Sequence, residues 1–203
     1  NIGDETATYR ISLELRRMTA EGTLADVAEP TPAEQAALSM ISYAPGRVTL
    51  EARQPQAIRL GIRAPQGLPD GEYRAHLLFR GVEKPAPAGA RPGPASGFTV
   101  SLTPIYGVTI PVIVRFGNLE AKAAISDAKL VNEGGKEAVS FDLSRSGNRS
   151  VYGEVRVLKP GRDKPVVFAR GIAVYPETAR RNVTLQVSPE VEGSIAGPAT
   201  IQY

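Results

Sequence analysis

The chain has 203 residues, no cysteine and one histidine, which excludes a disulfide framework and any thiolate or multi-histidine metal site. Its 24 basic and 21 acidic residues give a net charge of +3, and no window is dominated by one sign, so nucleic acid is not an expected partner. Apolar residues make up 42% of the chain, as in ordinary folded proteins, and the longest apolar stretch falls short of a membrane span.

Alternating polar and apolar residues in the first half of the chain predict short β-strands. The segment 7–18 alternates strictly, which is the period of two of a half-buried strand. Thr31 followed by Pro32 resembles a helix N-cap with proline at the first helical position, and indicates a short helical turn over 33–38. Further strands, separated by turns at the spacing typical of a β-sandwich, are expected at 48–52, 57–62 and 72–82.

The most distinctive pattern runs from Phe98 to Val114. Every even position except Pro104 carries a large apolar residue, so the segment predicts a strand with one apolar face. At about 3.4 Å per residue this strand would be about 55 Å long, far beyond the usual length of about six residues. Pro104 and Pro111 have no N–H to donate to a neighbouring strand, which indicates an edge strand or a bulge. An uncovered apolar edge promotes aggregation, so we expect a partner strand to cover it.

Beyond Phe116 the strand pattern starts again and predicts a second domain. We therefore place an N-terminal domain at 1–116 and a C-terminal domain at 117–203. Short segments rich in glycine, proline and asparagine mark the turns between the strands of the second domain. Six strands are expected there, at 122–130, 137–145, 151–158, 166–174, 181–187 and 198–203.

Several segments, taken in order and with their spacing, match one family. In the first half they are ATYRISLELRRM, SYAPGRVTLEARQPQAIRLGIRAP, LPDGEYRAHLLF and the end of the long strand, IPVIVRFG. In the second half they are SRSGNRSVYGEVRV and AVYPETARRNVTL. Over nearly its whole length the chain resembles the periplasmic pilus-assembly chaperones of the chaperone–usher pathway, the PapD-like family. The segment from Asp70 to Tyr73 also looks like the tyrosine corner of immunoglobulin-like domains.

The resemblance implies an all-β fold of two immunoglobulin-like β-sandwich domains, with the first strand of domain 1 missing from the chain. It also implies a secreted, periplasmic protein that binds and stabilises pilin-like subunits by donating an edge strand to them, with an outer-membrane usher as a further partner. By the family's spacing, the side chains that enter the subunit would be Val100, Leu102, Pro104 and Tyr106. The rest of the strand, 108–114, would pack in the chaperone's own core.

Two features depart from the family where the subunit's terminal carboxylate is anchored. Pro111 stands where the resemblance places a lysine, and the arginine that the resemblance implies would lie on the family's first strand, which is missing from the chain. Arg115 resembles the basic residue that helps to pair the two domains at the end of the long strand, and Glu83 is its expected acidic partner. The missing lysine keeps a second interpretation open, namely an envelope or surface adhesion module, related to the chaperones, that forms a homodimer through the same edge strand.

The sequence does not predict an enzyme. It contains no phosphate-binding loop, no G-x-S-x-G nucleophile motif and no carboxylate cluster with calcium spacing. We therefore expect no catalytic residue, no metal and no cofactor. His76 shares the strand phase of Arg74 and Arg80, and we expect its side chain to be exposed to solvent.

Overall fold

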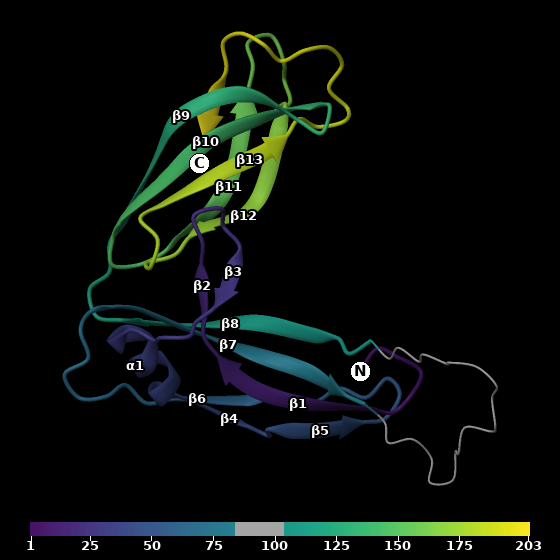
Figure 1. Ribbon diagram of the computed structural model, residues 1–203, viewed down its shortest axis with the longest axis vertical. Coiled ribbons are helices and arrows are strands. Elements are labelled where there is room, and N and C mark those ends of the chain that lie inside the picture. The colour runs from purple at the N-terminus through teal and green to yellow at the C-terminus, as the bar shows by residue number, and fades with distance from the viewer. Residues whose placement is uncertain (84–103) are drawn as a thin grey trace, which may run out of the picture. The chain divides into compact units, whose positions relative to one another are not determined.

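The computed structural model describes residues 1–83 and 104–203, and the chain separates into two compact units (Figure 1). Unit 1 consists of Asn1–Leu15, Pro30–Gly67 and Arg74–Ile113, and unit 2 consists of Arg16–Glu29, Leu68–Tyr73 and Val114–Tyr203. Each unit is therefore assembled from three segments that interleave along the chain. The expected domain boundary between residues 116 and 117 stays a prediction.

Unit 1 is built around one four-stranded sheet and one two-stranded sheet. The larger sheet has the order β5–β1–β7–β8 and consists of β5 (Arg47–Leu50), β1 (Ala7–Glu14), β7 (Gly71–Val82) and β8 (Gly107–Phe116). The smaller sheet pairs β4 (Ile41–Ala44) with β6 (Arg59–Ile62) in antiparallel register. The apolar residues buried in this unit include Ile11, Met40, Ile41, Leu50, Ala75 and Leu77.

The helix α1 (Pro32–Met40) confirms the expected helical turn and extends it. Thr31 is its N-cap, and its hydroxyl accepts a hydrogen bond from the Glu34 backbone N at 3.3 Å. The Glu34 carboxylate in turn accepts from the Thr31 backbone N at 2.7 Å, which completes a capping box. The helix continues to Met40 because Ala37 and Met40 are buried, a tertiary effect that the local pattern does not contain.

The single strand expected over 7–18 is wrong, because the chain divides it between two sheets. The strand β1 belongs to unit 1, whereas β2 (Arg16–Met18) forms a hairpin with β3 (Leu24–Asp26) in unit 2. The backbone N of Met18 donates to the Glu177 carboxylate at 2.9 Å, and the Thr178 hydroxyl donates to the Met18 carbonyl at 2.9 Å. These contacts with residues far along the chain attach β2 to unit 2.

Unit 2 is a sandwich of two three-stranded sheets, together with the β2–β3 hairpin. One sheet has the order β13–β10–β9 and consists of β13 (Arg180–Gln186), β10 (Lys136–Gly147) and β9 (Ala121–Glu133). The other has the order β12–β11–β14 and consists of β12 (Val167–Val174), β11 (Val151–Leu158) and β14 (Thr200–Gln202). The six strands expected from the sequence are thus confirmed. Their inward side chains form one buried core that includes Phe141, Leu143, Val155, Val157 and Val174.

A tyrosine corner is present at the start of β7. The Tyr73 hydroxyl donates a hydrogen bond to the Pro69 carbonyl at 2.7 Å, as the sequence motif indicates. Burial, together with the nearby charge of Asp70, raises the pKa of the Tyr73 phenol above its usual value of 10.0. The phenol therefore stays protonated, and remains a donor, throughout the neutral range.

Candidate functional site: the edge strand β8

Strand β8 lies at the border of the four-stranded sheet, and among the described strands its neighbour in the sheet is β7 (Figure 1). Three of its apolar side chains are exposed: Val108 at 61%, Ile110 at 48% and Ile113 at 37%. The expectation that the segment 108–114 packs in the protein's own core is therefore wrong for these three residues. Within the described part of the chain no strand pairs with the outer edge of β8, so the backbone groups that point to this edge have no strand partner there.

Two of the residues expected to contact a subunit, Pro104 and Tyr106, lie immediately before β8 and not within a strand. The carbonyl of Tyr106 accepts a hydrogen bond from the Gly81 backbone N at 3.0 Å, so the contact with β7 starts there. Pro104 has no N–H with which to extend the ladder further. The Tyr106 side chain is 78% exposed. The other two, Val100 and Leu102, lie outside the described residues.

A surface hollow of about 870 Å³ lies at this end of β8. The N-terminal segment 1–9, the end of β7 with Glu83, and the segment 104–106 line it. The Asn1 side-chain amide fixes the N-terminal segment, because it donates to the Glu51 carbonyl at 2.9 Å and to the Glu5 carbonyl at 2.8 Å. Exposed apolar side chains thus stand beside a recess in unit 1, as a surface that binds another chain requires.

At the other end of β8, Arg115 pairs with Glu72 and not with Glu83. The Arg115 Nε donates to Glu72 Oε2 at 3.1 Å. The backbone N and hydroxyl of Ser150 donate to the same oxygen at 3.2 and 2.7 Å. The Glu72 side chain is fully buried, whereas Glu83 is exposed. The expected Arg115–Glu83 pair is therefore wrong: the buried carboxylate holds the arginine because the protein supplies it with three donors.

The sequence alone did not identify Glu72 as a partner of Arg115, because Glu72 lies inside the tyrosine-corner motif and is interpreted there only as part of that motif.

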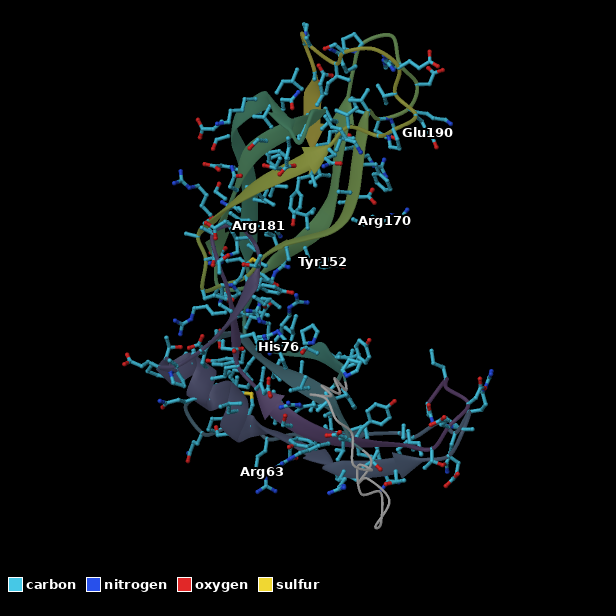
Figure 2. All side chains as sticks on the ribbon, turned by 45° about the vertical axis from the view of Figure 1, so that its right-hand side comes forward. Arg63, His76, Tyr152, Arg170, Arg181 and Glu190 are labelled. Atoms are coloured by element: carbon cyan, nitrogen blue, oxygen red, sulfur yellow. The ribbon has the colours of Figure 1, made fainter. Side chains whose placement is uncertain are left out.

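The prediction that His76 lies on the exposed face of β7 is wrong. The His76 side chain is 1% exposed and is labelled in Figure 2. Three successive residues, Ala75, His76 and Leu77, are buried, so both faces of β7 are covered here. A period of two identifies the faces of a strand but not how many of them are buried.

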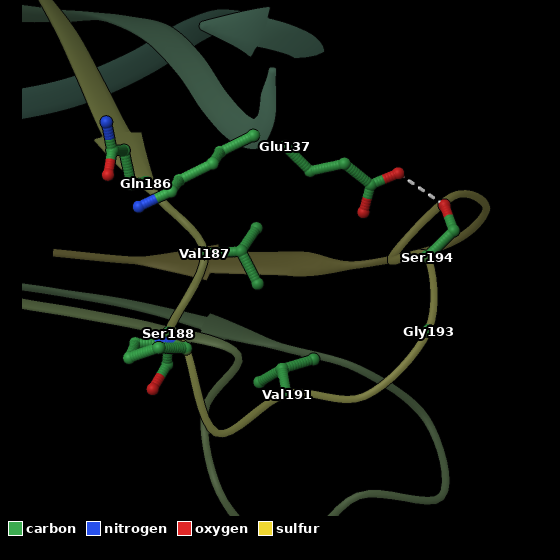
Figure 3. Close-up of a pocket in the computed structure, with 9 residues that line it drawn as sticks. Glu137, Gln186, Val187, Ser188, Val191, Gly193 and Ser194 are labelled. Atoms are coloured by element: carbon green, nitrogen blue, oxygen red, sulfur yellow. Dashed lines mark hydrogen bonds between the residues drawn. The ribbon is translucent and has the colours of Figure 1, made fainter. Parts of the chain in front are cut away.

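A second hollow, of about 590 Å³, lies in unit 2 beside Glu137 and Ser194 (Figure 3). The Ser194 hydroxyl donates to the Glu137 carboxylate, and the Ile195 backbone N donates to it at 2.8 Å. These hydrogen bonds lower the pKa of Glu137 below its usual value. Through these hydrogen bonds the Glu137 carboxylate ties residues 194–195 to the start of β10.

The described residues contain no group of three or more histidine, aspartate or glutamate side chains that could hold a metal ion. No helix among them is long and apolar enough to cross a membrane. The candidate site in unit 1 consists of the free backbone edge of β8 and the exposed side chains of Tyr106, Val108 and Ile110.

No protein-family model and no curated protein matches the chain. Among solved structures, the YadV chaperone matches with a TM-score of 0.50 and 15% identity, over 99% of this chain and 79% of that one. The class 5 fimbriae chaperone CfaA matches with a TM-score of 0.44 and 16% identity, over 98% and 86% of the two chains. A complex of the chaperone CsuC with the tip adhesion subunit CsuE, from the archaic chaperone–usher Csu pili of Acinetobacter baumannii, also matches. Its TM-score is 0.45 and its sequence identity is 11%, over 95% of this chain and 79% of that one.

The likeness to the YadV chaperone covers almost the whole chain and shows the fold. The protein has the fold of the PapD-like pilus chaperones, which confirms the all-β, two-domain fold class that the resemblance implies. At 15% identity the comparison shows the fold alone. The function of the candidate site has to be argued from its own residues.

Proposed function

We propose that the protein is a non-enzymatic, periplasmic chaperone that binds pilin-like subunits by lending them the free edge of β8. The observation that carries the proposal is the exposure of Val108 and Ile110 on that edge strand, next to the exposed Tyr106. A long edge with uncovered apolar side chains is an aggregation hazard for a protein that has no use for it. A subunit that lacks a strand would cover both the backbone and the side chains of this edge.

The alternation of the backbone shows which N–H and C=O groups of β8 point to its free edge. Because the Tyr106 carbonyl points to β7, the next residue, Gly107, directs its backbone groups to the free edge, and Thr109 does the same. Pro111 falls in this outward set, where its missing N–H leaves the pairing with β7 intact but removes one donor from the free edge. The edge that a subunit strand would pair with therefore lies before Pro111.

Side-chain alternation gives the contacts that would enter the subunit. Tyr106, Val108 and Ile110 are spaced by two residues and so lie on one face of the strand. Burying each such side chain contributes about 1.5–3 kcal/mol before the cost of ordering is subtracted. Val100 and Leu102 continue the same series in the sequence and belong to the proposed surface, as does Pro104. Contact with an outer-membrane usher is a further part of the proposal, and it rests on the family resemblance alone.

Co-expression with pilin-like subunits from the protein's own operon, followed by co-purification, tests the proposal. Tyr106→Asp and Val108→Asp should each abolish the complex, because a buried unpaired carboxylate opposes insertion. Tyr152→Asp is the matched control, since Tyr152 is 71% exposed but lies on β11 in unit 2. Circular dichroism checks that all three variants fold.

Normal co-purification of the Tyr106→Asp and Val108→Asp variants would reject strand donation. Light scattering of the protein by itself distinguishes the remaining interpretation. A stable homodimer that Val108→Asp converts to monomer, without any complex with a subunit, would favour a self-pairing envelope or adhesion module over a chaperone.

A further inference from the structure

Three arginines lie opposite one another on adjacent strands of unit 1. In the register of the four-stranded sheet, Arg10 of β1 is the partner of Arg47 on β5 and of Arg80 on β7. Directly opposed residues of neighbouring strands point to the same face of a sheet. All three side chains are exposed, so they form a cationic line across the sheet, which we call the arginine row.

The arginine row is unfavourable for the folded protein by itself. Neighbouring strands are about 4.8 Å apart, so the row is about 10 Å long, and like charges directly opposite each other destabilise a sheet. None of its three guanidinium groups forms an ion pair with a carboxylate of the described residues. Other exposed arginines of the protein do have such partners, for example Arg53 with Asp4 and Arg180 with Asp142.

A row of hydroxyl groups lies beside the arginine row. Thr8 of β1 is the partner of Thr49 on β5, two residues from the Arg10–Arg47 pair and on the same face. Their hydroxyls are 2.9 Å apart and lie at the exposed surface. The face therefore offers guanidinium donors next to hydroxyl donors, with no acidic partner from its own sheet in these two rows.

We propose that the arginine row docks an acidic, extended segment of a partner protein. Guanidinium groups form paired hydrogen bonds with carboxylates, which are stronger than neutral ones. Carboxylates on alternate residues of an extended chain are about 6.7 Å apart, so two of them fit within a row of about 10 Å. Their charge would cancel the repulsion among Arg10, Arg47 and Arg80. The row lies on the face of the sheet and not at the edge of β8, so the inference goes beyond strand donation.

The probe is a short fluorescent peptide in which aspartate alternates with threonine, and its control has asparagine in place of aspartate. Fluorescence anisotropy with the full chain should detect binding of the aspartate peptide alone, and added salt should weaken it. Arg10→Thr, which keeps a residue suited to a strand, should weaken binding about tenfold or more, since it removes the central charge-assisted contact. Arg63→Thr is the matched control and should change binding less than about twofold. Arg63 is exposed (Figure 2) and follows β6, which is not part of the sheet that carries the row.

Denaturant unfolding of the same variants gives an independent readout. Arg10→Thr should raise the midpoint of unfolding, because it relieves two like-charge contacts, whereas an arginine with a purely structural role would lower it on removal. Two results would overturn the proposal: binding of the aspartate peptide that Arg10→Thr leaves unchanged, or no binding of that peptide. Binding to phosphatidylglycerol vesicles in place of the peptide would also reject it, and would assign the row to a lipid surface. No pilin-like subunit is used, so the result is independent of the test of strand donation.

Discussion

The Arg115 guanidinium group donates to the buried Glu72 carboxylate at 3.1 Å, and this contact joins the end of β8 to the start of β7. Ser150 supplies two further donors to the same carboxylate oxygen. The ion pair is therefore asymmetric: Glu72 is fully buried, whereas the Arg115 side chain is 48% exposed. Water can solvate the arginine if the pair is broken, but it cannot reach the carboxylate.

This asymmetry predicts that the two partners contribute unequally to stability. Arg115→Ala leaves a buried carboxylate without its countercharge and should cost about 3 kcal/mol of unfolding free energy. Glu72→Gln leaves an arginine that water can solvate and should cost about 1–2 kcal/mol. Urea denaturation measures both values, and the double variant should lose less than the sum of the two. Equal losses for the single variants, and additivity in the double variant, would contradict a coupled pair.

The tyrosine corner gives a second prediction. Tyr73→Phe removes the hydrogen bond to the Pro69 carbonyl and should cost about 1 kcal/mol, which corresponds to a fall in Tm of about 2–4 °C for a chain of this size. Tyr152→Phe is the control, because that side chain is 71% exposed. Its free energy of unfolding should stay within about 0.5 kcal/mol of that of the unmodified protein. Thermal unfolding followed by circular dichroism compares the two. A Tyr73→Phe variant as stable as Tyr152→Phe would show that the corner adds nothing.

A third prediction separates two glycines that share a left-handed backbone. Gly147 has φ +101°, and an added Cβ would lie 2.2 Å from the Glu120 carbonyl oxygen. Gly134 has φ +60° with nothing within 4 Å of an added Cβ. Gly134→Ala should therefore lower the free energy of unfolding only by the cost of placing alanine in a left-handed backbone conformation, about 1 kcal/mol. Gly147→Ala carries a backbone clash as well and should cost about 3 kcal/mol or more. Similar midpoints of denaturation for the two variants would be inconsistent with the clash.

The lowered pKa of Glu137 predicts a pH dependence at the hollow of Figure 3. A carboxylate whose pKa is lower in the folded than in the unfolded state stabilises the fold above the unfolded value, and this contribution is lost as pH falls through the folded value. This loss of stability is therefore expected below pH 4.5, the usual pKa of glutamate. Ser194→Ala removes the largest cause of the shift, so an NMR titration should find the Glu137 pKa raised toward 4.5. An unchanged titration of Glu137 would rule out the serine hydroxyl as the cause.

Much of the local structure could be predicted from the sequence. The strands of unit 2, the capped start of α1 at Thr31 and the corner at Tyr73 all follow from patterns within a few residues of one another. Periodicity, capping and turn chemistry act over that range, which is why they can be identified in a single sequence. The long apolar segment ending at Val114 also predicts the strand β8 and makes it the candidate site.

The tertiary structure alone decided which surfaces those elements present. That Val108 is exposed, that His76 is buried and that Arg115 selects Glu72 depend on which strands lie next to β7 and β8. The arginine row likewise exists only through the register of three strands that are far apart in the chain. Local patterns assign side chains to the faces of a strand, but the neighbours of each face are chosen by long-range pairing, whose free energy no short window of sequence contains.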